Sequence, residues 1–328
     1  MISMLCAAVN GQSEENGFLV SKDRYLGQRP PGASPELFAP GVVSTGLQES
    51  NITFMPDGRE CYWSVLFAGF ATILTSRCEN GQWTKPEVAA FSGQSYDGWP
   101  SIQPDGKRLY FHSGRPVPIG TSGVTADYNI WYVERTETGW GEPKIVGIPV
   151  NGNENSTCPS LAGDGTICFS KRLPDGTEQI CLSRLVNGMY QELEILPKAV
   201  NAAQQNFHGT ISPDGRYLIR PINGINDGSN GDWNYYVCFK DRDGQWSNLI
   251  NLGKDVNAIS CGGSVSFSPD GKYLFLQGVT PLNNTLSRDR KYSLRELIEL
   301  DLNNTNGSSD IYWIGTDFID TLKPKDLK

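Results

Sequence analysis

Three residues whose side chains transfer protons, Glu49, Asp97 and His208, occupy comparable places ahead of a repeated Asp-Gly pair. Glu49 and Asp97 lie eight residues before the Asp of such a pair, and His208 lies six residues before one. Carboxylates and imidazoles serve as general acid, general base or nucleophile in many hydrolases and lyases. If the fold brings the three together, they are the candidate catalytic residues of this chain.

Other side chains near these places are suited to holding a polar ligand. An indole ring offers a flat stacking surface, while amide, hydroxyl and imidazole groups fix the orientation of a ligand through hydrogen bonds. The three candidate catalytic residues lack the local spacing of a metal site, so neither a metal ion nor another cofactor is predicted. The predicted ligand-binding residues are Asn51, Trp99, His112, Cys158, Asn206 and Ser264.

An internal repeat defines these places. An Asp-Gly pair after Pro, or once after Gly, recurs five times with the same flanking pattern, and its aspartates are separated by 48, 59, 50 and 56 residues. A hydroxyl residue always stands four positions before the Asp, and apolar residues follow four and five positions after it. A further Pro174-Asp175-Gly176 lacks that pattern. Strand, Asp-Gly turn and strand form a β-hairpin, and regularly repeated four-stranded units indicate a β-propeller. The aspartates are Asp57, Asp105, Asp164, Asp214 and Asp270.

The last repeat lacks a fourth strand, and residues 37–43, before the first repeat, are a candidate for it. A propeller closed in this way has no free sheet edge. We therefore predict an all-β, five-bladed β-propeller of four-stranded antiparallel blades, a single domain over residues 25–320. Residues 1–24 are predicted to be a signal remnant or a disordered N-terminus, and 321–328 a tail. The alternative has six blades, with the extra blade in the insertion at 277–309.

Propeller geometry sorts the loops onto two faces. The Asp-Gly turns lie on one face, and the long segments around 112–127, 221–231 and 277–309 lie on the other. The first strand of each blade lines the central channel, so the candidate residues are predicted to surround the channel mouth on the long-loop face. Within the last insertion, the spacing of Leu294, Leu297 and Ile298 predicts a short helix over that mouth.

The segment Ser266-Phe-Ser-Pro-Asp-Gly-Lys-Tyr-Leu-Phe275 resembles the WD40-like repeat called PD40. That repeat occurs in the propeller of the translocation protein TolB and in many exported bacterial proteins. The opening Tyr25-Leu-Gly-Gln-Arg-Pro-Pro-Gly and the closing Asp310-Ile-Tyr-Trp also look like a group of uncharacterised exported PD40 proteins. The resemblance implies a β-propeller, often periplasmic and used for protein contacts, and it implies no single activity.

Composition excludes several classes of partner. The 328 residues carry a net charge of −8 without an obvious basic patch, which disfavours nucleic acid. No run reaches the ~18–20 apolar residues of a spanning helix, so no membrane span is predicted. The small and apolar residues after Met1 favour a periplasmic or secreted protein, or a cytoplasmic one if Met1 is the true start. Two cysteine pairs, Cys61 with Cys78 and Cys168 with Cys181, are disulfide candidates or buried thiols.

Two functions follow as hypotheses. The repeat fold without a nucleophile or metal motif favours an exported binding module that holds a protein, peptide or glycan ligand at the channel mouth. The alternative is a carbohydrate-active hydrolase or lyase at the same mouth, with Asp97 or Glu49 as acid or nucleophile and His208 as proton shuttle. A serine peptidase is rejected because the chain has no Gly-x-Ser-x-Gly. The sequence leaves open whether the chain is an enzyme.

Overall fold

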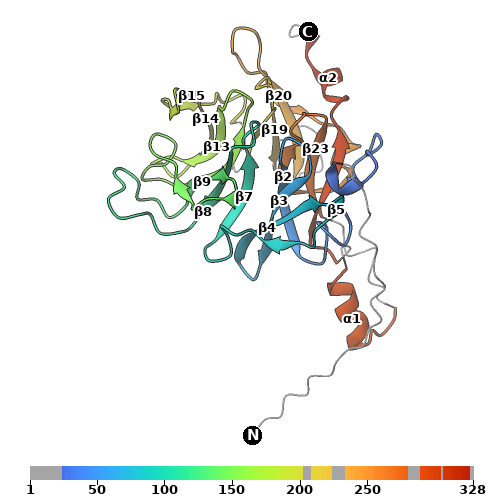
Figure 1. The fold of residues 1–328 in the computed structure, drawn as a ribbon. Helices are drawn as coiled ribbons and strands as arrows, with labels where there is room; N and C mark the ends of the chain where they lie inside the picture. The colour runs from blue at the N-terminus through green and yellow to red at the C-terminus, as the bar shows by residue number, and fades with distance from the viewer. Residues whose placement is uncertain (1–23, 202–207, 224–232, 280–288, 304–305, 326–328) are drawn as a thin grey trace.

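Five antiparallel sheets stand around a central channel and form a five-bladed β-propeller, as predicted (Figure 1). The computed structural model describes residues 24–201, 208–223, 233–279, 289–303 and 306–325. The alternative of six blades is wrong, because the described part of the 277–309 insertion forms helix α1 (Leu294–Asp301) rather than another sheet.

Each blade runs from an inner strand at the channel to an outer strand at the rim. Blade 1 contains β2 (Gln48–Phe54), β3 (Glu60–Phe67), β4 (Phe70–Glu79), β5 (Gln82–Trp83) and β6 (Glu87–Val88). Blade 2 contains β7 (Asp97–Ile102), β8 (Arg108–Ser113), β9 (Asn129–Thr136), β10 (Gly139–Trp140) and β11 (Lys144–Ile145). Blade 3 contains β12 (Ser156–Leu161), β13 (Ile167–Arg172), β14 (Glu178–Ser183) and β17 (Glu194–Ile195), with the hairpin β15 (Leu185–Val186) and β16 (Met189–Tyr190). Blade 4 contains β18 (Thr210–Ile211), β19 (Tyr217–Ile222), β20 (Asn234–Phe239) and β21 (Ile250–Asn251). Blade 5 contains β22 (Ser260–Phe267), β23 (Tyr273–Val279), β24 (Ser309–Gly315) and β1 (Glu36–Leu37).

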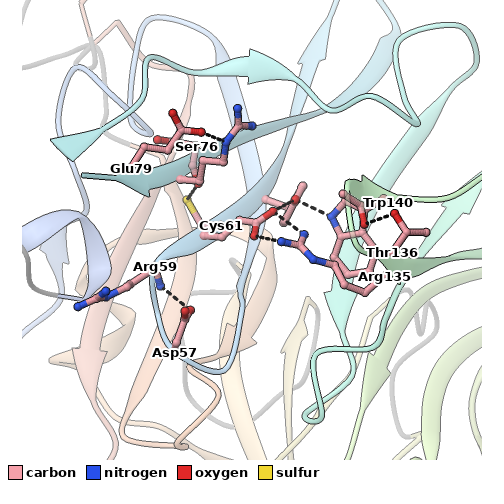
Figure 2. Close-up of polar contacts among 12 residues, drawn as sticks. Asp57, Arg59, Cys61, Ser76, Glu79, Arg135, Thr136 and Trp140 are labelled. Atoms are coloured by element: carbon pink, nitrogen blue, oxygen red, sulfur yellow. Dashed lines mark hydrogen bonds and ion pairs between the residues drawn. The ribbon is translucent and has the colours of Figure 1, made fainter. Parts of the chain in front are cut away.

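The Asp-Gly turns between the first and second strands share one geometry. The Asp57 carboxylate accepts a hydrogen bond from the backbone N–H of Arg59 at 3.0 Å (Figure 2). The other four turn aspartates accept the same bond from the residue two positions on. The glycine that follows each turn aspartate has a φ between 69° and 83°, a region that residues with a Cβ rarely adopt. The repeated Asp and Gly therefore build turns rather than a reactive centre.

The fourth strands are shorter than the sequence predicts, because a side chain replaces the backbone pairing after two residues. In blade 2, Asn151 Oδ1 accepts from the N–H of Ile130 at 2.8 Å, and its Nδ2 donates to the Ile130 carbonyl at 2.8 Å. This bonding clamps the end of the blade to its third strand, and we call such residues the strand clamps. The equivalent clamps in blades 3, 4 and 1 are Asn201, Asn257 and Ser92.

The N-terminal segment closes the ring, as predicted. Strand β1 pairs antiparallel with β24, with Leu37 opposite Tyr312. The backbone N–H of Phe38 donates to the carbonyl of Ile311 at 2.8 Å. The Ser44 hydroxyl donates to the same carbonyl at 3.1 Å and accepts from the Ile311 N–H at 3.2 Å, so Ser44 is the strand clamp of blade 5.

Apolar side chains of neighbouring blades pack face to face and form the core. At the junction of blades 5 and 1, Phe38, Phe54, Phe275 and Trp313 are at most 2% exposed, and contacting ring centroids lie between 5.0 and 6.0 Å apart. Burial of four large aromatic side chains stabilises the junction through the hydrophobic effect and ring packing. The ring is therefore closed by side-chain packing as well as by strand pairing.

A polar network joins blades 1 and 2 on the outside of this core (Figure 2). The Arg135 guanidinium donates two hydrogen bonds of 2.9 Å to the Glu60 carboxylate and stacks over the ring of Trp140. Trp140 Nε1 donates to the Tyr62 hydroxyl at 2.6 Å. Bidentate pairing of this kind fixes geometry as well as charge, so the network sets the angle between the two blades.

The cysteines form no disulfide among the described residues, so of the two alternatives left open by the sequence, both pairs are free thiols. Cys61 lies opposite Ser76 in the β3–β4 register, which leaves Cys78 two residues farther along. A displacement of two residues is about 6.6 Å along a strand, too far for a relaxed disulfide. Cys168 lies opposite Leu182, one position away from Cys181, so the two thiols point to opposite faces of blade 3.

Helix α1 forms where the spacing of its apolar residues predicts a short helix, but its predicted position over the channel mouth is not confirmed. It begins with a capping box between Ser293 and Glu296 and projects away from the sheets (Figure 1). Its apolar residues Leu294, Leu297 and Ile298 are 74%, 47% and 51% exposed. Helix α2 (Ile319–Leu322) follows the last strand. In the described part of the chain, no helix is both long and apolar enough to cross a membrane.

Candidate functional site

The inner strands of three blades bend at the position six residues before the turn aspartate. Asn51, Trp99 and Cys158 have φ values of 40°, 52° and 53°, and the strand register shifts beside each of them. These are β-bulges, which turn the backbone N–H away from its own sheet. Each N–H donates to a side chain of the preceding blade, and the acceptors are Ser264 Oγ at 3.0 Å, Ser64 Oγ at 2.8 Å and His112 Nδ1 at 3.2 Å.

Four rings gather at the bulge of blade 2, and we call them the aromatic cluster: Tyr96, Trp99, His112 and Tyr128. Trp99 stacks on His112 with centroids 4.7 Å apart, and Tyr96 stacks on His112 at 5.9 Å. Tyr128 meets Tyr96 edge to face at 5.5 Å. His112 is buried, while the other three rings are partly exposed. Trp99 Nε1 is buried without a hydrogen-bond partner.

Both histidines are neutral near pH 7. Burial lowers the pKa of His112 to about 3. Burial, helped by the positive charge of Arg220 and by His112, lowers the pKa of His208 to about 3. Because the N–H of Cys158 donates to Nδ1 of His112, the neutral ring of His112 carries its proton on Nε2. An imidazole with so low a pKa is a poor proton donor near pH 7, which is unfavourable for His208 as a proton shuttle.

Asp97 is buried and fully engaged by neighbouring donors. Its Oδ1 accepts from the Ser113 hydroxyl at 2.6 Å and from the Arg115 guanidinium at 2.8 Å, and its Oδ2 accepts from the Ser92 hydroxyl at 3.0 Å. The side chain is 0% exposed, and that of Arg115 is 15% exposed. A carboxylate held in this way stabilises the junction of blades 1 and 2.

Buried cationic side chains stand at three successive blade junctions, and we call Arg115, Lys171 and Arg220 the anchor cations. Each donates to the backbone carbonyl of the residue just before a strand clamp. Lys171 also donates to the Ser156 hydroxyl at 3.1 Å, and Arg220 to the His208 carbonyl at 3.2 Å. The accepting carbonyls belong to Phe91, Val150 and Val200. The anchor cations thus tie the outer edge of one blade to the next blade.

Glu49 lies at the junction of blades 5 and 1, close enough to Asp310 to feel its charge. Both residues are 0% exposed. Glu49 Oε1 accepts from the Thr45 hydroxyl at 2.5 Å, whereas Glu49 Oε2 and both carboxylate oxygens of Asp310 have no hydrogen-bond partner. Burial, together with the nearby charge of Asp310, raises the pKa of Glu49 to about 8. Burial raises the pKa of Asp310 to about 7.

A cavity of about 50 Å³ lies between the inner strands, next to the Asp-Gly turns. The repeated hydroxyl residues line it and bond to the next blade. Thr53 and Ser160 accept from the N–H groups of Ile102 and Ile211, at 3.1 and 3.2 Å. Thr210 and Ser266 donate to carbonyls of the following blade, at 2.5 Å each. These hydroxyls hold the inner strands together, and the cavity has room for little more than water.

The structure brings together some of the predicted site residues and separates others. Trp99, His112 and Cys158 are in contact, and the pKa of His208 responds to His112. Asn51 contacts Ser264 at the 5–1 junction. Glu49 and Asp97 belong to different junctions, and Asn206 lies outside the described residues. Sequence reasoning did not single out Tyr96, Tyr128, Asp310 or the anchor cations as site residues.

In the described residues, no group of three or more His, Cys, Asp or Glu side chains is placed to hold a metal ion. The thiols are also unsuited as nucleophiles, since burial raises the pKa of Cys158 to about 12 and those of Cys181 and Cys261 to about 11. A thiol of this kind is protonated near pH 7 and therefore inert. Among the described residues, the aromatic cluster offers stacking faces and hydrogen-bonding groups.

Comparison with known proteins gives likeness of fold only. No protein-family model and no curated protein matches this chain. TolB from Acinetobacter baumannii is 21% identical with a TM-score of 0.44, over 70% of this chain and 48% of that one, so the chain spans about half its length. A putative TolB from Agrobacterium tumefaciens is 18% identical with a TM-score of 0.43, over 70% and 74%. An alpha-L-arabinofuranosidase from Podospora anserina, solved with cellotriose, is 14% identical with a TM-score of 0.47, over 87% and 94%. At these values the likeness carries no information on activity or partners, and the propeller assignment rests on strand topology.

Proposed function

We propose that this propeller is a non-catalytic binding module that holds a polar ligand against the aromatic cluster at the long-loop mouth of the channel. The observation that carries the proposal is the state of Trp99. Its indole ring is partly exposed, is stacked on His112, and is fixed by the backbone bond to Ser64. A rigid, partly exposed ring face suits a ligand that has a flat surface.

The ligand classes that fit are a glycan, or a peptide segment of a protein. A sugar ring presents C–H groups to an aromatic face and hydroxyls around its rim, and a peptide presents side chains and carbonyls. Tyr96 and Tyr128 extend the surface beside Trp99, and both rings are partly exposed. The protein itself is acidic, with a net charge of −8, so a neutral or cationic ligand is favoured over a polyanion.

Several observations favour binding over the alternative of a carbohydrate-active hydrolase or lyase. Such hydrolases use two carboxyl groups that flank the bond at roughly 5–9.5 Å. Asp97 is occupied by Arg115, Ser113 and Ser92, and Glu49 belongs to another blade junction. His208 is only 2% exposed and is neutral near pH 7. The engagement of Asp97 and the burial and neutrality of His208 therefore favour binding over the alternative.

We also propose that the chain is a PD40-type propeller that works outside the cytoplasm. The segment from Ser266 to Phe275 and the opening from Tyr25 support the resemblance, and the small and apolar residues after Met1 support export. Residues 1–23 lie outside the described part of the chain. Cell fractionation of the full-length protein tests export, and recovery in the cytoplasm with Met1 intact would contradict it.

Binding is tested with glycan and peptide arrays, followed by calorimetry on any ligand found. Trp99→Gly removes the ring and suits the φ of 52° at this position. We expect it to weaken binding at least about tenfold, as loss of an aromatic contact would. Trp99→Phe keeps a stacking face without the N–H and should weaken binding less. Met189→Ala, an exposed apolar residue on the β15–β16 hairpin, is the control and should bind normally. Unchanged binding by Trp99→Gly, or turnover of a glycoside by the wild type, would contradict the proposal.

A further inference from the structure

The junction between blades 5 and 1 differs from its neighbours in charge. The junctions of blades 1–2, 2–3 and 3–4 each contain an anchor cation, namely Arg115, Lys171 and Arg220. The 5–1 junction instead contains the two buried carboxyl groups of Glu49 and Asp310. Three of their four oxygens have no hydrogen-bond or ion-pair partner among the described residues.

The internal repeat places the two carboxyl groups on either side of one strand clamp. Asp97 and Glu49 both stand eight residues before a turn aspartate. At the 1–2 junction, Thr72 Oγ1 lies 3.3 Å from the Ser92 hydroxyl, which lies 3.0 Å from Asp97 Oδ2. Thr72 immediately precedes Ile73, whose N–H donates to Ser92. In the same way, Asp310 immediately precedes Ile311, whose N–H donates to Ser44.

This equivalence predicts what is missing from the 5–1 junction. At the 1–2 junction, the carboxylate of Asp97 is neutralised by the Arg115 guanidinium, which also reaches the carbonyl of Phe91. At the 5–1 junction the equivalent carboxylate is Glu49, a second carboxyl group is added, and the carbonyl equivalent to that of Phe91 belongs to Val43. A buried carboxylate without a partner is strongly unfavourable, so these groups must either hold protons or be neutralised by a cation.

The other possible metal ligands at this junction are hard oxygen atoms. The Thr45 hydroxyl donates to Oε1 of Glu49. The Ser309 hydroxyl donates to the backbone carbonyl of Glu49. Carboxylate, hydroxyl and carbonyl oxygens suit Ca²⁺, which accepts six to eight oxygen ligands in irregular geometry. The absence of His and Cys from this set of donors disfavours zinc. Two carboxylates also balance the charge of one divalent cation.

We propose that the 5–1 junction binds a calcium-type divalent cation through the carboxylates of Glu49 and Asp310. The ion takes the place that the anchor cations hold at three of the other four junctions. Because Glu49 lies in β2 and Asp310 lies in β24, the ion ties the first blade to the last one. The inference is independent of what the aromatic cluster binds.

The test begins with the wild-type protein freed of metal by dialysis against EGTA. Equilibrium dialysis with radioactive calcium at pH 7.5 should give one ion per chain. Adding about 1 mM CaCl₂ should raise the midpoint of thermal unfolding by about 4 °C or more, relative to NaCl of equal ionic strength. Glu49→Gln and Asp310→Asn should each abolish both effects, while Glu299→Gln, on the exposed surface of α1, should retain them.

Each contrary result overturns the proposal. No bound calcium in the wild type, which needs no variant to fold, means that the pair carries protons instead. In that case Glu49→Gln and Asp310→Asn are expected to be as stable as the wild type or more stable. Calcium binding that persists in both variants means that the ion binds elsewhere. If either variant fails to fold, anomalous scattering from wild-type crystals grown with calcium decides whether the ion lies between the two carboxylates.

Discussion

The ring of His112 in blade 2 accepts a hydrogen bond of 3.2 Å from the backbone N–H of Cys158 in blade 3. The bond joins two blades and requires an unprotonated Nδ1. The same ring supports Trp99, the residue on which we base ligand binding. The protonation state of one buried imidazole is therefore linked both to the packing of the blades and to the shape of the channel mouth.

We expect the protein to lose stability in acid because of its histidines. Unfolded histidine titrates near 6.5, whereas burial lowers the pKa values of His112 and His208 to about 3. Between these values the unfolded chain binds more protons, so this contribution is complete above pH 6.5 and is lost as the pH falls toward 3. Each histidine should cost on the order of 1 kcal/mol per pH unit below 6.5, measured by urea unfolding.

Carboxylates also take up protons in acid, and the variant His112→Asn separates the contribution of His112 from theirs. Asparagine keeps a hydrogen-bond acceptor near the position of Nδ1 and does not titrate. The difference in free energy of unfolding between the wild type and His112→Asn should change in favour of the variant as the pH falls from 8 to 4.5. A difference that stays constant across this range would show that His112 is protonated equally in both states.

Loss of an anchor cation should strongly destabilise the propeller. Arg115→Ala leaves Asp97 buried with a charge that no other cation neutralises. We expect the free energy of unfolding to fall by about 3–5 kcal/mol. Arg295→Ala is the matched control, because it breaks an exposed ion pair with Glu299 on α1 and should cost less than about 0.5 kcal/mol. Equal effects of the two substitutions, measured by chemical denaturation, would refute the structural role of Arg115.

The strand clamps should tolerate replacement by serine better than by alanine. Asn151→Ala leaves the N–H and carbonyl of Ile130 without their partners, at a cost of about 2–4 kcal/mol. Asn151→Ser should cost less, because Ser92 and Ser44 perform the same task in other blades. Comparing the two variants in denaturant tests the assignment, and a serine variant as unstable as the alanine one counts against it.

Alkylation of the native protein should discriminate among its cysteines. Cys78 is the one partly exposed thiol of the seven described cysteines, and the others are buried. Burial also raises the pKa values of Cys61 and Cys168 well above the usual range. We expect iodoacetamide to modify Cys78 at least about 100-fold faster than Cys61 or Cys168, as followed by peptide mass spectrometry. Similar rates at all three would contradict the packing described for blades 1 and 3.

The sequence was sufficient for the fold because the propeller is built from local signals that repeat. The Asp-Gly turns recur at similar spacing, and four of the five hydroxyl residues four positions before the turn aspartates bond to the next blade. The closing strand was predictable because a ring of sheets leaves no edge unpaired. Each of these features follows from the conformation of a few neighbouring residues.

The site was less predictable because its residues meet through long side chains that reach across blades. The anchor cations lie ten, seven and six residues after their turn aspartates, at Arg115, Lys171 and Arg220, so no alignment of the repeats places them together. Asp97 was correctly placed at a first strand, yet its ion pair with Arg115 comes from a loop. The partners of Glu49 were missed for the same reason, since Asp310 is separated from it by most of the chain.

Ring closure between the two ends of the chain also dictates the order of events at the ribosome. Ser44 and its partner Ile311 are 267 positions apart, so the closing segment is among the first described parts to emerge and its sheet is among the last. Phe38, 0% exposed in the finished fold, can pack on Phe54 of blade 1 early, but Phe275 and Trp313 of blade 5 join it only when translation is nearly over. The nascent chain therefore carries an incompletely covered apolar segment for most of its synthesis, and folding can finish only after the last strand has been released.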